Sequence, residues 1–211
     1  MFLISKILFI HRKNLKMLDQ NQLDEYRKDL KFSESLCGQS LNYQSTWGIF
    51  SPREIDSGTK LLMKYIEVNP EDDCFDLGCG YGPIGLTMAK LAPKGETILV
   101  DKDFMAVEYA NKNAKANNIN NAKAQLSNGF QHIESDRSFD VIASNVPAKV
   151  GKEMMSLMLH DAHQHLNKGG KLYLVTVNGL RQYMKRNLKE VFGNYKKVKQ
   201  GAAYTIHLAS K

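Results

Sequence analysis

The segment from Asp76 to Gly85 reads DLGCGYGPIG and places four glycines directly after a short apolar run. Because glycine has no Cβ, a chain that turns sharply here from a strand into a helix lets its backbone approach a ligand closely. Asp101 follows Gly80 by 21 positions, at the expected end of the next strand, where a carboxylate can accept hydrogen bonds from both hydroxyls of a ribose. These features predict a site for a cofactor that contains adenosine.

Two cofactors compete for this pattern, a dinucleotide and S-adenosylmethionine. A dinucleotide presents its pyrophosphate to the N-terminus of the helix, and the carboxylate of Asp76 would sit poorly beside that charge. The same carboxylate can attract the ammonium group of a methionine moiety, through a water or a neighbouring backbone group. The sequence therefore favours S-adenosylmethionine, and an NAD-dependent oxidoreductase is the weaker alternative.

A second group of chemically suited residues, SNVPA at positions 144–148, follows an apolar run that begins at Phe139. Pro147 restricts Val146 to an extended conformation, so the carbonyl of Val146 and the side-chain oxygen of Asn145 can both face one ligand. Two adjacent acceptors suit a planar amino group and can hold its nitrogen in line with the methyl carbon of a sulfonium. Asn145, Val146 and Pro147 are therefore predicted to be catalytic in methyl transfer to an amine.

Strand and helix patterns alternate along the chain from about residue 41, and they predict an α/β fold with a doubly wound, mostly parallel sheet. The last two strands are joined through Gly201 and predict an antiparallel hairpin. In such a sheet a ligand lies outside the carboxyl ends of the strands, where the glycine turn, Asp101 and Asn145 all fall. One of the connecting helices is expected to turn the following residues inward: Met154, Leu157, Met158 and Ala162.

The composition is that of a globular chain with a substantial core, because 43% of its 211 residues are apolar and 24% are charged. No apolar run approaches the roughly 20 residues that a membrane-spanning helix needs, and the sequence predicts a cytoplasmic protein that binds no membrane. Three cysteines without paired spacing predict reduced thiols. His160, His163 and His165 lack an acid at ligand spacing, so no metal site is predicted.

The chain carries 29 basic and 22 acidic residues, a net charge of +7 that is compatible with a polyanionic partner. The excess is concentrated between Leu180 and Gln200, where seven basic residues accompany a single acid, Glu190. This region is the best candidate for a surface that faces phosphates, and a solvated helix face is the simpler alternative. Lys149 and Lys152, beside the Asn-Val-Pro turn, are further candidates for contacts with a substrate's phosphates.

Four segments together resemble the small-domain class I methyltransferases related to the 16S ribosomal RNA guanine-N2 methyltransferases and their single-domain archaeal relatives. They are residues 48–59 (GIFSPREIDSGT), 76–82 (DLGCGYG), 144–147 (SNVP) and 151–153 (GKE). The resemblance extends from about Tyr43 to the carboxyl terminus. It implies a seven-stranded sheet, S-adenosylmethionine as the methyl donor and guanine in ribosomal RNA as the acceptor.

The resemblance also implies particular roles: Gly78, Gly80 and Asp101 contact the cofactor, Asn128 lies near the adenine amino group, and Asn145 holds the target amine. The full set of cofactor-binding residues that we predict is Asp76, Gly78, Cys79, Gly80, Asp101, Lys102, Asn128 and Asn145.

The chain departs from the family at two positions of the catalytic turn. Val146 stands where the family has the first proline of Asn-Pro-Pro, and Ala148 stands where it has an aromatic ring that stacks on the target base. Such stacking is worth about 1–3 kcal/mol per base, and another ring would have to supply it. Trp47, Phe50 and Tyr43 are the candidates, although each could equally cover the edge of the sheet. The predicted substrate-binding residues are Trp47, Phe50, Lys149 and Lys152.

The sequence thus predicts an N-terminal extension over residues 1–40, partly helical from Leu18 to Leu30, and a methyltransferase domain over residues 41–211. The predicted function is methylation of an exocyclic amino nitrogen of RNA, with guanine N2 of ribosomal RNA as the expected target. Two alternatives remain open: N5 methylation of a protein glutamine, and a catalytically idle domain that binds RNA or a partner subunit.

Overall fold

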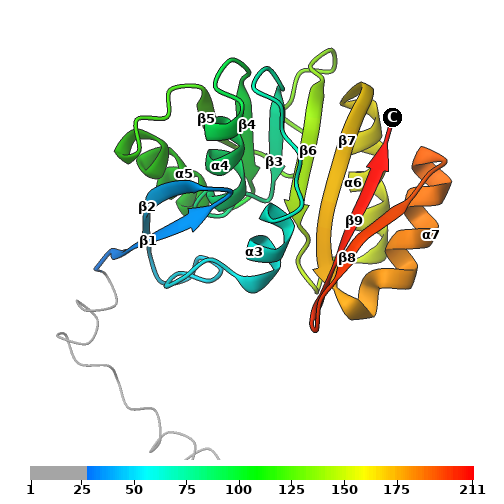
Figure 1. Cartoon of the computed structure of the whole chain (residues 1–211), viewed down its shortest axis with the longest axis horizontal. Coiled ribbons are helices and arrows are strands. Elements are labelled where there is room, and N and C mark those ends of the chain that lie inside the picture. Colours follow the sequence, from blue (N-terminus) through cyan, green and yellow to red (C-terminus); the bar gives the residue numbers. More distant parts are fainter. Residues whose placement is uncertain (1–27) are drawn as a thin grey trace, which may run out of the picture.

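A computed structural model describes residues 28–211 of the chain (Figure 1). A seven-stranded sheet with the strand order β5-β4-β3-β6-β7-β9-β8 forms its centre. The first five strands in this order are parallel, and β9 runs antiparallel to both β7 and β8. The predicted α/β class, the doubly wound sheet and the C-terminal antiparallel hairpin are therefore confirmed.

The strands are β1 (Leu30–Leu36), β2 (Gln39–Ser45), β3 (Cys74–Leu77), β4 (Thr97–Asp101), β5 (Ala122–Leu126), β6 (Phe139–Asn145), β7 (Leu166–Val177), β8 (Lys196–Gln200) and β9 (Tyr204–Ser210). The helices are α3 (Ser57–Met63), α4 (Pro83–Leu91), α5 (Phe104–Ala116), α6 (Lys152–Gln164), the short 3-10 helix η1 (Asn178–Leu180) and α7 (Arg181–Phe192).

Two hydrophobic clusters lie on opposite faces of the sheet. One joins α3, α4, α5 and the β1–β2 hairpin to side chains such as Leu99 and Tyr173. The other joins α6 and α7 to Phe75 and Ile142. Because both faces are covered, the central strands are apolar on both sides, as parallel strands in an α/β fold must be. The strand ends are then the only part of the central sheet that a ligand can reach.

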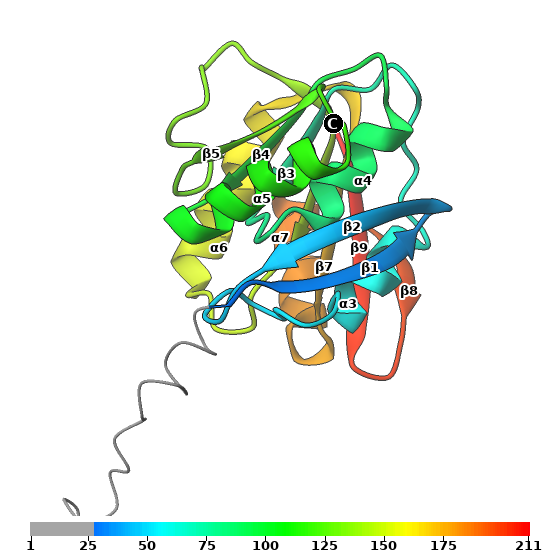
Figure 2. The same cartoon turned by 90° about the vertical axis from the view of Figure 1, so that its left-hand side faces the viewer.

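The β1–β2 hairpin is an element that the sequence analysis did not predict (Figure 2). Asn113 and Asn117, one turn apart on α5, hold its second strand through hydrogen bonds with the backbone of Gln44 and Asn42, at 2.7 to 2.9 Å. The two amides act as a substitute for a neighbouring strand. The sequence does contain a signal for this hairpin. Leu41 and Tyr43 alternate with polar residues along 39–45, in step with the burial pattern of β2, and Gly38 provides the turn.

The expected division of the chain at residue 40 falls inside this hairpin. The predicted helix from Leu18 lies almost wholly outside the described residues, and its last residue, Leu30, is the first residue of β1 instead. Of the predicted helix, the structure describes only residues 28–30, and none of them is helical, which corrects the prediction at that end. The division into an extension and a domain stays a prediction.

The predicted inward face of helix α6 is correct at Ala162 and partly correct at Met158, which packs against the core, but it is wrong at Met154 and Leu157. Met155, Leu159 and Ala162 are buried, whereas Met154 and Leu157 are 49% and 58% exposed. The apolar residues of this helix cover more than one face, so spacing alone admits two inward orientations about 100° apart. Packing against α7 and the sheet selects the second of them.

Candidate active site

The glycine turn between β3 and α4 divides into an open part and a packed part. Gly78 and Gly80 have φ angles of +77° and +56°, and a Cβ added to either would meet no heavy atom within 4 Å. A Cβ on Gly85 would instead lie 2.4 Å from Cγ of Leu99. The first two glycines therefore leave backbone open to a ligand, and the last lets α4 pack closely on β4.

Gly85→Ala is expected to lower the free energy of unfolding by about 1–3 kcal/mol, because the added methyl overlaps Leu99 in a buried contact. Urea unfolding of the two proteins measures the difference. Gly179→Ala is the control, since Gly179 is exposed, no heavy atom lies within 4 Å of its added Cβ and its φ is not positive. Equal stability of the Gly85 variant and the wild type would contradict the packing role.

Asp101, the last residue of β4, orders the turn from the other side. One carboxylate oxygen accepts the backbone N–H of Gly80 at 2.9 Å and the other accepts that of Asp103 at 3.0 Å. The side chain is only partly buried. A carboxylate has about four acceptor positions, so this one retains capacity for two ligand hydroxyls. Its geometry fits the predicted contact with a ribose.

Asp76, predicted to attract an ammonium group through a water or a neighbouring backbone group, lies behind the glycine turn. Its carboxylate is fully buried, and one oxygen accepts the backbone N–H of Gly85 at 2.7 Å. The second oxygen has no hydrogen-bond partner in the described part of the chain. Burial raises the pKa of this carboxyl from its usual 3.8 to about 7, the Gly85 hydrogen bond opposes the shift, and the charge of Asp101 adds to it. Asp76 therefore holds the glycine turn through its hydrogen bond with Gly85.

The buried carboxyl of Asp76 predicts a particular pH dependence of stability. Its pKa is higher in the folded chain than in the unfolded one, so the folded state binds the extra proton between about pH 4 and 7. The resulting stability is fully present below this window and is lost as the pH rises to 7. Asp76→Asn lacks the titration, and we expect its free energy of unfolding, relative to wild type, to rise from pH 4 to 7 and then level off.

Urea unfolding at a series of pH values measures this difference. Buried His207, with its pKa lowered by desolvation to about 4, has the opposite pH dependence, but it is present in both proteins and cancels in the comparison. A difference that does not vary with pH would exclude the raised pKa.

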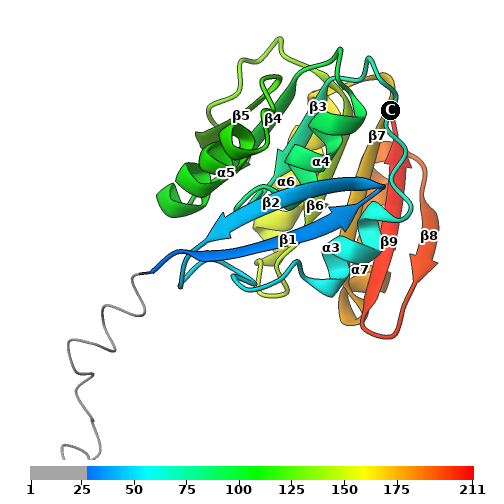
Figure 3. The same cartoon turned by 60° about the vertical axis from the view of Figure 1, so that its left-hand side comes forward.

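Strand β6 ends at Asn145, between β3 and β7 in the sheet (Figure 3). The side-chain amide of Asn145 is held in one orientation. The amide nitrogen donates to a carboxylate oxygen of Asp56 at 2.7 Å and to the hydroxyl of Thr59 at 3.0 Å. Asp56 is an acceptor, so the nitrogen must face it. The side-chain oxygen receives no hydrogen bond from the described residues. It can therefore accept a hydrogen bond from a bound amine, as its predicted role requires.

Asp56 is a functional residue whose second role the sequence analysis missed. Its first role is to cap α3, where it accepts the backbone N–H groups of Gly58 and Thr59. Its carboxylate also accepts the amide of Asn145 and the hydroxyl of Tyr204, 148 positions away, at 3.1 Å. Contacts between residues so distant in sequence leave no local pattern, so only the fold reveals them.

The remaining residues of the catalytic turn leave the sheet beside Asn145. Val146 is buried, and its backbone N–H donates to the carbonyl of Val175 at 3.0 Å, which extends the pairing of β6 with β7. Pro147, Lys149 and Lys152 are exposed. The two lysines thus lie at the surface next to the turn, where the sequence analysis expected them to meet a substrate.

The loop between β2 and α3 is fixed at two points of the site. Tyr81, in the glycine turn, donates its hydroxyl to the carbonyl of Glu54 at 3.2 Å, and Asp56 contacts Asn145. Phe50 is 69% exposed and Trp47 is 37% exposed, with the guanidinium of Arg53 above the Trp47 ring at 4.6 Å. Phe50 and Trp47 therefore remain accessible to a substrate.

Tyr43 does not share that position. It is 1% exposed and packs against the rings of Phe32 and Tyr81 in the core. Tyr43 is too deeply buried to stack on a base, which removes it from the three aromatic candidates.

The other predicted cofactor residues surround the same strand ends. Lys102 and Asn128 are exposed and follow β4 and β5. The side chain of Cys79 is buried, with its sulfur directed to the carbonyl of Gly80, and burial raises the pKa of its thiol well above the usual value. Only the backbone of Cys79 is therefore available to a cofactor.

Comparison with known proteins agrees with this geometry. Residues 40–208 match the family model described as the methyltransferase small domain. A Bacillus subtilis protein named YbxB is 32% identical over 183 residues, which cover 85% of this chain and 90% of that protein. This chain belongs to the methyltransferase small-domain family. The predicted family and enzyme class are confirmed.

Two further relatives extend the comparison. The ribosomal RNA small subunit methyltransferase C of Haemophilus influenzae is 32% identical over 80% of this chain and 51% of its own length. A Thermus thermophilus 16S rRNA N2 guanosine methyltransferase, solved in complex with AdoMet and guanosine, superposes with a TM-score of 0.79 at 27% identity, over 87% of this chain and 50% of that one. The chain spans about half the length of these methyltransferases.

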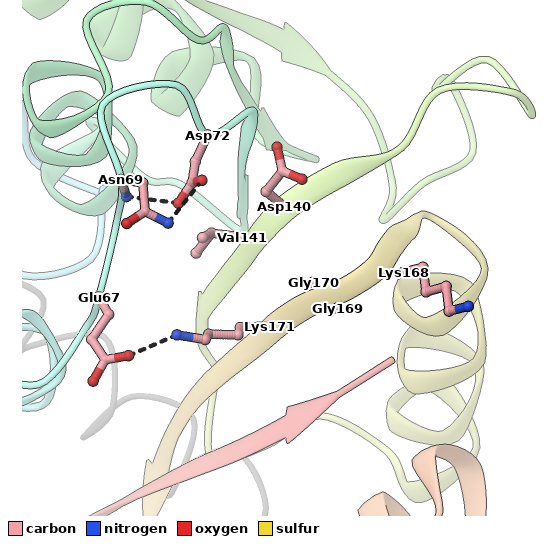
Figure 4. Close-up of a pocket in the computed structure, with 9 residues that line it drawn as sticks. All are labelled: Glu67, Asn69, Asp72, Asp140, Val141, Lys168, Gly169, Gly170 and Lys171. Carbon is pink, nitrogen blue, oxygen red and sulfur yellow. Dashed lines mark hydrogen bonds and ion pairs between the residues drawn. The ribbon is translucent and has the colours of Figure 1, made fainter.

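A separate pocket lies at the opposite edge of the sheet from the methyltransferase site (Figure 4). Asp140 and Val141 line it where β6 begins, and Lys171, paired with Glu67 at 2.7 Å, lines it from β7. The glycine turn and Asn145 do not contribute to it. Within residues 28–211 no group of acids, histidines and cysteines is arranged to hold a metal ion, and no helix has the length and apolar character to span a membrane.

Proposed function

We propose that this methyltransferase transfers the methyl group of S-adenosylmethionine to an exocyclic amino nitrogen of ribosomal RNA, with N2 of guanine as the target. The observation that carries the proposal is the orientation of Asn145. Its amide donors are occupied by Asp56 and Thr59, and its oxygen is left as an acceptor at a strand end beside the open glycine turn.

The chain's own residues suit the donor. Gly78 and Gly80 leave the backbone open where the methionine portion would lie, and Asp101 retains acceptor capacity for ribose hydroxyls. The unpartnered oxygen of Asp76 lies beneath the turn, where it can accept a hydrogen bond from an ammonium through a water or a neighbouring backbone group. A nearby ammonium would favour the charged form of this carboxyl, whose pKa burial raises to about 7. Bound S-adenosylmethionine supplies a methyl group on a positively charged sulfur, which is already an activated electrophile.

The acceptor needs alignment more than activation. The Asn145 oxygen and the carbonyl of Val146 accept the two N–H bonds of a planar amine, which directs the nitrogen lone pair along the line of attack. A general base is not required before transfer, because methylation lowers the pKa of the nitrogen and the proton then leaves readily. Asn145 is thus the catalytic residue, and Asp56 and Thr59 are positioning residues.

Three observations support RNA as the acceptor. The chain has a net charge of +7, its catalytic turn is flanked by exposed Lys149 and Lys152, and two of the relatives described above are ribosomal RNA methyltransferases by name. With Ala148 in place of the family's aromatic residue, we propose that Phe50, the most exposed ring of the neighbouring loop, stacks on the target base, with Trp47 beside it.

Total RNA from a strain that lacks the gene tests the proposal when it is incubated with the protein and S-adenosylmethionine carrying a labelled methyl group. Nucleoside mass spectrometry is expected to find labelled N2-methylguanosine. Label in protein and not in RNA would favour the glutamine alternative. Binding of S-adenosylmethionine without any transfer to RNA or protein would favour the catalytically idle domain.

A further inference from the structure

One group of basic side chains is not used by the proposed reaction at Asn145. It lies on α7 and on the edge strand β8, which are side by side at the end of the sheet opposite β5 (Figure 1). We define the basic edge as Arg181, Lys185, Lys197 and Lys199. We propose that the basic edge binds the phosphate backbone of the RNA whose base is methylated, an inference that rests on the proposed function.

The first observation is the convergence of two cations on one neutral side chain. Arg181 donates to the side-chain oxygen of Gln200 at 2.6 Å, and the ammonium of Lys197 approaches the same oxygen at 3.5 Å. An uncharged acceptor neutralises neither cation. Lys185 lies one turn after Arg181 on the same face of α7, which extends the positive surface along the helix.

The second observation is that the side chains of the basic edge form no ion pairs in the described part of the chain. None of the ion pairs among residues 28–211 involves a member of the basic edge. Some exposed lysines elsewhere do pair with acids: Lys94 with Glu71, Lys112 with Glu108, and Lys171 with Glu67. Others, such as Lys115 and Lys123, form none of these ion pairs, so it is the grouping of four unpaired cations that distinguishes the basic edge. Positive charge that forms no ion pairs attracts a polyanion at long range.

The third observation is that contacts connect the basic edge to the catalytic residue. Gln200 is followed by the β8–β9 turn, whose carbonyls at Gly201 and Ala202 accept the amide of Asn178. Tyr204, directly after this turn, donates to Asp56, and Asp56 accepts the amide of Asn145. Arg181, the member of the basic edge that contacts Gln200, therefore lies at the end nearest to Asn145, the residue proposed to hold the target amine.

Helix α7 also touches the segment that follows the catalytic turn. The hydroxyl of Tyr183 donates to the backbone carbonyl of Lys152 at 2.9 Å. Lys149 and Lys152 are exposed beside that contact. An RNA strand that brings a base to Asn145 can thus place neighbouring phosphates along these lysines and the basic edge. Phosphate contacts of this kind position an RNA without reading its sequence.

A purely protective role of the lysines on β8 is the competing explanation. Lysines on an edge strand prevent it from pairing with other chains. That explanation covers Lys197 and Lys199, but it gives no role to Arg181 or Lys185. It also leaves unexplained why Arg181 and Lys197 both contact the side-chain oxygen of Gln200. The two explanations predict different effects on RNA binding.

Gln200→Glu is the sharpest test, because it keeps every basic residue and places a carboxylate between Arg181 and Lys197. We expect a threefold to tenfold weaker affinity for unmodified 16S rRNA made by transcription, measured by filter binding without S-adenosylmethionine. The slope of log affinity against log salt concentration should also fall by about one. Gln164→Glu makes the same change at another exposed glutamine, at the C-terminal end of α6, and is the matched control that should leave both quantities unchanged.

A paired reversal provides the second test. Lys197→Glu with Lys199→Glu is expected to weaken binding of the same RNA at least tenfold and to reduce the salt slope by about one to two. Lys115→Glu with Lys123→Glu alters the net charge equally on α5 and on the opposite edge strand, β5. Equal effects of the two pairs, or no effect of either, would overturn the proposal. Displacement of the RNA by polyglutamate as effectively as by unlabelled RNA would also overturn it, in favour of an acidic protein partner.

These measurements separate the inference from the proposed function. RNA binding is measured without methyl transfer, and the same variants are then assayed for N2-methylguanosine with the wild type as reference. A wild type that binds RNA through the basic edge but methylates nothing would refute the proposed function and leave the surface assignment intact. A wild type that methylates RNA while the Gln200 variant binds normally would refute only the surface.

Discussion

Replacing Asn145 by alanine is expected to lower kcat for methyl transfer to RNA by about 10²–10³, because a single positioned hydrogen-bonding group in an active site is worth that much. The variant removes the acceptor oxygen that aligns the amine and leaves the glycine turn and Asp101 intact. The Kd for S-adenosylmethionine should therefore stay within about threefold of wild type, as calorimetry can measure. A kcat within threefold of wild type would show that Asn145 does not hold the target amine.

The contact between Asn145 and Asp56 allows a sharper version of this experiment. Asn145→Asp retains an acceptor but brings a second carboxylate to the 2.7 Å contact with Asp56, and like charges at that distance repel. We expect kcat to fall nearly as far as in the alanine variant. Adding Asp56→Asn restores a donor and an acceptor with their direction reversed and should recover at least tenfold in kcat. An Asp56→Asn change that gives no recovery would assign Asp56 to capping α3 alone.

The elements and strand ends of this fold were predictable from sequence because their signals are local. The glycine turn and the apolar runs of β3, β4 and β6 each occupy a few consecutive residues. The same holds for the N-cap of α5, where the side chain of Asp103 accepts the backbone N–H of Met105. A parallel sheet then brings the carboxyl ends of those strands to one edge. The proximity of Gly80, Asp101 and Asn145 to a single edge therefore followed without a structure.

What was not predictable depends on contacts between distant segments or on the choice between similar packings. The amide of Asn145 is held by Asp56, which in turn accepts the hydroxyl of Tyr204, and these three residues are far apart in sequence. The inward face of α6 depends on which of two apolar stripes packs against α7. The burial of Tyr43, which excludes it from substrate binding, depends on a hairpin docked on α5. None of these has a period or a motif of its own.

Asp101→Ala is expected to raise the Kd for S-adenosylmethionine by about 100-fold. Two hydrogen bonds from ribose hydroxyls to a carboxylate are worth about 1.5 kcal/mol each at the low end, and each 1.4 kcal/mol is a factor of ten. The loss of the acceptor for Gly80 N–H at 2.9 Å adds to the effect, because the open turn is then less ordered. Asp101→Asn keeps a neutral acceptor and should give an intermediate Kd. Thermal unfolding of both variants distinguishes weaker binding from a loss of fold.

The same substitution tests which part of the donor Asp101 contacts. Adenosine alone contains the ribose but no methionine portion, so its Kd should rise by a similar factor in Asp101→Ala if the carboxylate holds the ribose hydroxyls. A large change for S-adenosylmethionine with none for adenosine would move Asp101 to the methionine end of the site. The proposed function places the methionine portion at the open backbone of Gly78 and Gly80. If Asp101 contacted the methionine portion instead, the donor would have to bind in the reverse direction along the strand ends, with its methyl group away from Asn145. Equal factors for the two ligands instead leave the methyl group beside the catalytic turn.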